Sequence, residues 1–350
     1  MGKRNHAFDF LCGICILRML SLHTMEFCGL QSEAWWKEIM QWSYFFMSFF
    51  FFKAGYFNKS VVGPTLAYCK DKAKRLLIPY FTTGLIGFVI YFSFLPFLLN
   101  RYKNPIEPLS WDHIWLTSEW YGNAPTWFLF SFFSAYICIH FLEKARHRLL
   151  GGRVSHGVML WSSSIYLLFP LLSYWCFESH NPVWLNLNNV PMGIFFFELG
   201  RVWRRVMERF GQEKTVVFSV VLILLFIAGN IIFHDASYVM SSNKFRGDFC
   251  ATMFNTTVIL CGLSGLLISV NLPRVPVINY IGQHSMVYFV GHYPILYYYK
   301  FTHLCFGYSI YGHGNHVLVL LPAIIMICSW LVPFIESTPW LSGRWPKKTV

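Results

Sequence analysis

The chain is poor in charged residues, which make up 13% of its 350 positions, while hydrophobic residues make up 55%. Soluble domains carry about 25% charged residues. So little polar surface cannot cover a water-soluble globule, and the composition therefore excludes an ordinary soluble protein. The hydrophobic residues also gather into segments of about 20 residues, the length at which a helix spans a bilayer.

Two further features narrow the possible functions. The ten cysteines lie mostly inside hydrophobic segments, where cysteine behaves as a small apolar residue. We therefore expect no metal site and no disulfide framework. The formal net charge of +12 is spread over short connectors instead of being clustered on a soluble face, so we expect no nucleic-acid partner.

The hydrophobic segments predict an all-α integral membrane protein, with about ten transmembrane helices in one bundle and a single membrane domain over residues 1–350. Polar residues interrupt the second, sixth and ninth segments, which makes these three the weakest. The expected spans are 8–27, 38–57, 76–99, 126–143, 157–176, 190–207, 215–233, 250–271, 278–299 and 315–335.

The distribution of lysine and arginine supports this topology. With the N-terminus and the C-terminus in the cytoplasm, 20 of the 28 basic residues fall in cytoplasmic segments and six in external ones, while Arg18 and Lys53 lie within spans. Basic residues concentrate in cytoplasmic loops of membrane proteins. An odd number of spans would mix the basic and the non-basic connectors between the two sides of the membrane, and this unequal division of lysine and arginine would disappear.

Three polar residues inside the expected spans are candidates for function, because a charged side chain in the bilayer is costly and usually faces a protein interior. His23 lies roughly 22 Å along the first helix from Phe8, and an imidazole can take and return a proton near neutral pH. Glu26 follows three residues later on the same helical face and can orient the ring. Lys53 stands in the second span, where it either serves function or extends to the lipid headgroups. Glu198 ends the sixth span, where we expect an ion pair with a nearby arginine.

Five segments together resemble the type-three membrane acyltransferases, the O-acyltransferases of bacterial surface glycans. The first resembles the family's first span, which ends in a histidine, and the second resembles its aromatic second span. The third is similar to Arg-x-x-Arg-Leu-x-x-Pro-Tyr and the fourth to Pro-x-Trp-Phe-Leu, while the fifth resembles the family's ninth span. The segments are Phe8–His23, Phe49–Phe57, Lys72–Tyr80, Ala124–Leu129 and Tyr280–Pro294.

The resemblance implies an acyl-CoA co-substrate, expected to be acetyl-CoA, and a hydroxyl of a glycan or lipid-linked saccharide as acceptor. It implies no permanently bound cofactor and a multi-pass location in the bacterial cytoplasmic membrane. His23 matches the catalytic histidine, with Glu26 beside it, and Lys72 and Arg75 match the basic pair at the donor. The remaining expected site residues, at the acceptor or along the channel, are Arg18, Trp127, Ser285, Tyr288 and His292.

One position departs from the family pattern, because Cys12 stands where the family has its first-span arginine. Cys12 lies on the same face of the helix as His23, about 20° away, whereas Arg18 lies about 140° away and cannot substitute. Lys53 is expected at about the depth of Cys12. We therefore expect Lys53 to supply the missing positive charge in the donor site.

The sequence leaves the chemical role of His23 open. It either removes the proton of the acceptor hydroxyl or carries the acyl group covalently. A secondary transporter or glycan exporter without catalysis is the competing function class, because intramembrane His, Lys and Glu also suit transport. A membrane receptor or scaffold is a third class, disfavoured by the lack of a sizeable extramembrane segment. The sequence predicts no oligomeric state.

Overall fold

A computed structural model describes residues 5–58, 64–101, 111–149, 164–177 and 184–345, and this part of the chain is mostly helical. Four short 3-10 helices accompany the α-helices: η1 Ala124–Thr126, η2 Ser164–Leu167, η3 Trp184–Asn189 and η4 Met240–Ser242. The α-helices are α1 His6–Phe27, α2 Ala34–Trp42, α3 Phe46–Phe57, α4 Thr65–Arg101, α5 Trp111–Thr117, α6 Trp127–Leu149, α8 Leu168–Phe177, α9 Val190–Arg209, α10 Gln212–Ile232, α11 Phe249–Ser269, α12 Pro276–Gln283, α13 Ser285–Cys305, α14 Gly314–Ser337 and α15 Pro339–Ser342.

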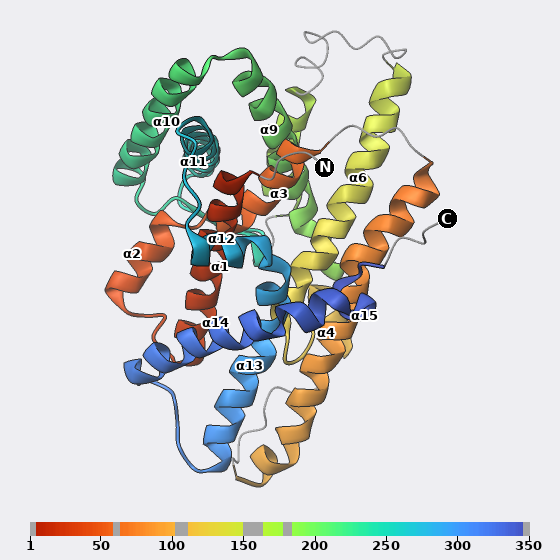
Figure 1. Ribbon diagram of the computed structural model, residues 1–350, viewed down its shortest axis with the longest axis vertical. Coiled ribbons are helices and arrows are strands. Elements are labelled where there is room, and N and C mark those ends of the chain that lie inside the picture. Colours follow the sequence, from red (N-terminus) through yellow and green to blue (C-terminus); the bar gives the residue numbers. More distant parts are fainter. Residues whose placement is uncertain (1–4, 59–63, 102–110, 150–163, 178–183, 346–350) are drawn as a thin grey trace.

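Helix α1 lies inside the bundle, and most of its residues are buried. It contacts α3, α11, α12, α13 and α14. Figure 1 shows α10 and α11 side by side at one edge of the molecule and α4 with α6 at the opposite edge. Three residues expected in the site, Arg18, His23 and Glu26, therefore project from a helix that protein surrounds, which lets their polar groups avoid lipid.

Among the described residues, six helices are long and apolar enough to cross a membrane, which agrees with the predicted all-α membrane protein. The other four expected spans do not meet this test in the part of the chain that the structure describes, and residues 157–163 of the span expected at 157–176 lie outside the described residues. The total of ten spans and the cytoplasmic termini stay predictions. The six helices are His6–Phe27, Thr65–Phe94, Ala124–Leu149, Gln212–Ile232, Phe249–Ser269 and Gly314–Ser337.

The span expected at 38–57 is wrong as a single helix, because α2 ends at Trp42 and α3 begins at Phe46. The Ser43 hydroxyl donates a hydrogen bond to the Ile39 carbonyl at 2.5 Å. Serine side chains that bond to nearby backbone groups in this way compete with the regular helix. The Tyr44 hydroxyl then donates to the Thr252 carbonyl on α11, so tertiary contacts hold the break.

The span expected at 278–299 is also divided, between α12 and α13, at His284. His284 leaves helical geometry at φ −106° and ψ 24°. Its Nδ1 lies 2.9 Å from the Glu336 carboxylate at the end of α14. The break therefore has a partner from a segment about 50 residues further along the chain, which no local pattern reveals.

Helix α12 crosses α1 at close range through two glycines. A Cβ on Gly282 would lie 1.7 Å from the Asp9 carbonyl oxygen, and one on Gly13 would lie 2.1 Å from the Ile278 carbonyl oxygen. Only glycine allows the two backbones to approach this closely. The Asn279 amide also donates to the His6 carbonyl at 2.7 Å, so the start of α1 is fixed against α12.

A short antiparallel hairpin, which the hydrophobic pattern did not predict, follows α10. Its strands are β1 Ser237–Val239 and β2 Lys244–Arg246, with Tyr238 opposite Phe245. Asn243 turns the chain with a positive φ of 49°, a conformation that asparagine tolerates better than most residues. The Asn243 side-chain oxygen accepts hydrogen bonds from Tyr238 and from Ser173 on α8.

Candidate active site

His23 and Glu26 form a pair on the last turns of α1. The His23 Nδ1 lies 2.9 Å from the Glu26 Oε2, and the two side chains are 18% and 41% exposed. An ionised carboxylate only accepts hydrogen bonds, so Nδ1 carries the proton and Nε2 of the neutral ring keeps a free lone pair. Glu26 thus lies where the helical spacing placed it, and the pair has the arrangement of a carboxylate that orients a base.

A second histidine stacks on the first. The His292 ring on α13 lies 5.3 Å from the His23 ring between centroids, at an interplanar angle of 26°. The Tyr293 ring meets His23 edge-on at 4.9 Å. His292 is fully buried, and its Nδ1 donates to the Tyr288 carbonyl at 2.9 Å. Its Nε2 is buried with no hydrogen-bond partner among the described residues, and His292 itself lines neither of the two cavities described below.

The side chains of His23 and Glu26 line a large cavity, here named the outer cavity, of about 770 Å³. Volumes between about 300 and 1,000 Å³ are typical of small-molecule sites. Trp127, at the start of α6, lines it as well. Arg18 also belongs to its wall, where its Nε donates to the Ser43 hydroxyl at 3.2 Å and its guanidinium lies 3.9 Å from the centre of the Phe46 ring.

The far wall of the outer cavity comes from segments that sequence reasoning did not connect to the site. Residues of α2 and of the β1–β2 hairpin supply aromatic rings and charges there, including Trp36, Lys37, Glu38, Tyr238 and Arg246. Aromatic rings beside charged groups suit a ligand with both apolar faces and many hydroxyls. The polar and aromatic residues of α2 and of the hairpin do not show from the sequence alone that these two segments meet.

A second cavity, here named the inner cavity, has a volume of about 390 Å³ and is lined by Cys12, Lys53 and Lys72. The Lys53 ammonium donates to the Cys12 sulfur at 2.9 Å. Lys53 therefore lies at the depth of Cys12, the position at which the family pattern has an arginine. The Lys72 ammonium lies 3.8 Å from the centre of the Tyr136 ring, within cation–π range.

The structure separates some residues that the sequence grouped. Arg75 does not line the inner cavity beside Lys72; its side chain is 62% exposed and pairs with Asp71 at 3.0 Å. Ser285 lines the inner cavity and not the acceptor side. Tyr288 lines neither cavity, because its ring is fully buried and its hydroxyl shares a 2.6 Å hydrogen bond with Ser329.

Asn123, which sequence reasoning missed, fixes the segment that carries Trp127. It is fully buried, and its side-chain amide donates to the Thr83 carbonyl on α4 at 3.1 Å and to the Val290 carbonyl on α13 at 3.0 Å. The Thr126 hydroxyl donates to the Asn123 carbonyl at 2.7 Å. These bonds tie η1, which leads into α6, to α4 and α13.

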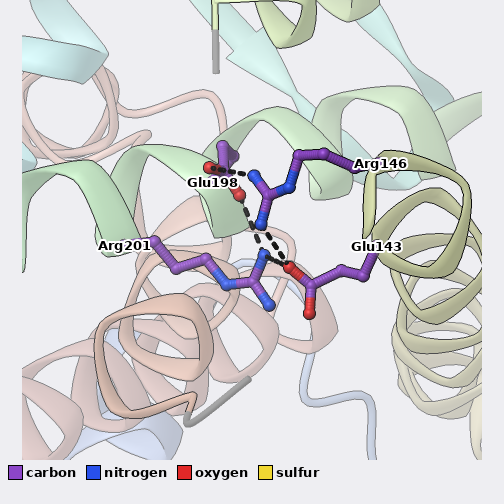
Figure 2. A network of polar contacts seen from close by, with 4 residues as sticks. All are labelled: Glu143, Arg146, Glu198 and Arg201. Carbon is purple, nitrogen blue, oxygen red and sulfur yellow. Dashed lines mark hydrogen bonds and ion pairs between the residues drawn. The ribbon is translucent and has the colours of Figure 1, made fainter. Parts of the chain in front are cut away.

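Two acids and two arginines form an ion network between α6 and α9 (Figure 2). Glu143 and Arg146 come from α6, and Glu198 and Arg201 come from α9. Arg201 lies 2.5 Å from Glu143 and 3.1 Å from Glu198, while Arg146 lies 2.8 Å from Glu143 and 3.7 Å from Glu198. The expected pairing of Glu198 with a nearby arginine is confirmed. The four charges balance, which is what buried ions require.

Comparison with known families agrees with this geometry. A family model described as an acyltransferase domain matches residues 5–335, nearly the whole chain. The chain belongs to this family, the acyltransferase 3 family. A comparison with curated proteins finds no match. The protein is therefore a multi-pass membrane acyltransferase, and the function class predicted from the five sequence segments is confirmed.

Proposed function

We propose that the protein transfers an acetyl group from acetyl-CoA, bound at the inner cavity, to a hydroxyl of a saccharide in the outer cavity. The observation that carries this proposal is the presence of two cavities that share Phe289 in their lining, with His23 at the wall of the larger one. The smaller cavity has lysines at its wall, and the larger one has aromatic and charged walls. An acyl transfer between two substrates from opposite membrane faces needs such an arrangement.

The donor is held by its charges. Lys53 and Lys72 line the inner cavity, and the exposed Arg75 lies on the same helix as Lys72, three residues further on. Ammonium and guanidinium groups bind phosphates through charge-assisted hydrogen bonds. The thioester arm of the donor extends into the inner cavity while its phosphates stay near these basic groups.

The transfer step uses the free lone pair of His23. As the hydroxyl oxygen of the saccharide bonds to the thioester carbonyl carbon, Nε2 of His23 accepts the hydroxyl proton. The carbon–sulfur bond then breaks, and the proton moves to the departing thiolate sulfur. Glu26 holds Nδ1–H and stabilises the positive imidazolium that forms between these events. The His292 ring, which stacks on His23 at 5.3 Å between centroids, holds the imidazole in place.

The acceptor is a glycan or a lipid-linked saccharide, and the protein acts in the bacterial cytoplasmic membrane with its donor site inside. The 20-to-6 division of basic residues supports this orientation. It puts Lys53 and Lys72 toward the cytoplasm, where acetyl-CoA is made. The outer cavity then opens on the side where surface glycans are assembled.

The purified protein in detergent, given radiolabelled acetyl-CoA and a saccharide mixture from the cell envelope, tests the proposal. We expect label in the saccharide with the wild type and a loss of about 10²- to 10⁴-fold with His23→Ala, the usual contribution of a general base. His303→Ala is the matched control, because His303 is a histidine near the end of α13 that lines neither cavity. No transfer by the wild type from any acyl-CoA would contradict the proposal.

The same material separates the two roles of His23. Rapid quenching after the donor alone, followed by mass spectrometry of the peptide with His23, detects a covalent acetyl-histidine if the relay operates. The mechanism given above, with His23 as a base, predicts an unmodified peptide.

A further inference from the structure

The two cavities are divided by a thin wall, and Phe289 on α13 is the one residue among those lining either cavity that lines both. Its side chain is buried, with 5% exposed. Its ring lies 5.3 Å from the Phe128 ring and 6.5 Å from the His292 ring, between centroids. Phe289 therefore stands between the donor side and the histidines.

The rest of the wall comes from neighbouring residues on three other helices, which are apolar except for Arg18. On α1 the lining changes from the inner cavity at Ile16 to the outer cavity at Arg18. On α3 it changes between Phe50 and Met47, and on α6 between Phe128 and Trp127. Each change takes one helical turn or less, so the two linings follow directly on one another along each helix.

This position has a chemical consequence for the proposed reaction. The acyl carbon must reach an oxygen that arrives from the outer cavity, and the wall decides how far the acyl group extends past the inner cavity. An apolar wall also keeps water of the outer cavity away from the thioester, which water can hydrolyse. A bulky ring at this point serves both purposes, because its volume ends the inner cavity and restricts the passage between the two cavities.

We propose that Phe289 is the specificity-determining residue for the acyl group: its ring limits the acyl chain to a short one and protects the thioester from hydrolysis. The inference rests on the proposed function and deepens it, since it assigns the acyl-length limit to one side chain. Removing the ring joins the two cavities, so that longer acyl groups fit and water reaches the carbonyl carbon. In that hydrolysis the water oxygen bonds to the carbonyl carbon, the carbon–sulfur bond breaks, and the free acid and the thiol of CoA are released.

The test compares Phe289→Ala and Phe289→Leu with the wild type in two assays. The first measures release of the CoA thiol from acetyl-CoA without acceptor, and the second measures kcat/KM for transfer from acetyl-CoA and butyryl-CoA. We expect Phe289→Ala to raise acceptor-free hydrolysis about 10-fold. We also expect it to raise the butyryl-to-acetyl ratio by about 10-fold or more, since one methylene in an apolar pocket changes rates by roughly 10- to 200-fold. Phe289→Leu should give a hydrolysis rate and a butyryl-to-acetyl ratio between those of the wild type and of Phe289→Ala.

Phe226→Ala is the matched control, because Phe226 on α10 is equally buried, with 4% exposed, and lines neither cavity. It loses the same ring and should leave the hydrolysis rate and the butyryl-to-acetyl ratio unchanged. Unchanged values in both Phe289 variants, with wild-type transfer intact, overturn the assignment of Phe289 but not the proposed function. Absence of wild-type transfer overturns the proposed function first, and the assignment with it.

Discussion

The hydrogen bond between His23 and Glu26 makes the sharpest prediction. Glu26→Gln keeps the shape of the side chain but removes its charge and adds an N–H donor. The amide can then donate to Nδ1, which moves the ring proton to Nε2 and blocks the lone pair that must accept the hydroxyl proton. A fraction of the enzyme is therefore held in the unproductive tautomer.

The size of the effect follows from the geometry. The bond is 2.9 Å long, but the Glu26 side chain is 41% exposed. A hydrogen bond to a charged group contributes about 1.5–3 kcal/mol, and solvent at this partly exposed carboxylate favours the lower end. We therefore expect Glu26→Gln to lower kcat about 10-fold, which corresponds to 1.4 kcal/mol, with little change in KM.

The assay is the transfer of radiolabelled acetyl to saccharide at saturating donor, for both single variants and for the double variant with His23→Ala. If Glu26 acts only through the ring, the double variant should be no slower than His23→Ala alone. Glu26→Asp should recover part of the rate because it restores the charge. An unchanged kcat in Glu26→Gln, or an independent loss in the double variant, would refute the orienting role.

Three further predictions use the same preparations. Lys53→Met should reduce acetyl transfer as severely as loss of the catalytic histidine. Cys12→Arg added to Lys53→Met should restore part of the transfer rate, because the Lys53 and Cys12 side chains meet at 2.9 Å. Full activity of Lys53→Met in the transfer assay would contradict a role for Lys53 in the donor site. Glu198→Gln leaves buried guanidinium groups partly uncompensated and should lower the free energy of unfolding by about 3 kcal/mol, measured by denaturant unfolding in detergent, while an unchanged midpoint would show that the network adds no stability. The Glu38 carboxylate raises the pKa of His234 by a hydrogen bond, so the ion pair is present below that pKa and is lost as the pH rises through it. NMR titration should show a lower pKa for His234 in Glu38→Gln than in the wild type. An unshifted pKa would contradict the pairing.

The sequence could predict those parts of the site that depend on one helix. His23 and Glu26 are three residues apart, so helical geometry alone brings them together. The depth of Lys53 relative to Cys12 needed only two helices of known direction. The ion pair of Glu198 could also be expected, because a buried carboxylate needs a partner and Arg201 is three residues away.

The parts that the sequence could not predict depend on contacts between distant segments. The breaks at Ser43 and His284 are held by α11 and by the end of α14. Polar residues mark both segments as weak spans, but no local pattern shows which distant segment holds each break. Arg75 turns toward Asp71 instead of the cavity, a rotation of a side chain that spacing does not determine. Phe289 looked like any other phenylalanine in an aromatic chain, because only the positions of the two cavities distinguish it.

The glycine contact between α1 and α12 also bears on the chemistry, although it lies ten residues from His23, about 15 Å along the helix. With backbone against backbone at Gly13 and Gly282, the first helix has no freedom to roll about its long axis. A roll of about 20° would carry a side-chain tip, about 6 Å from that axis, sideways by about 2 Å. A misplacement of 1 Å at a reacting group can cost about 100-fold in rate. The absence of a Cβ atom at Gly13 and at Gly282 therefore fixes the orientation of the His23 imidazole further along the same helix.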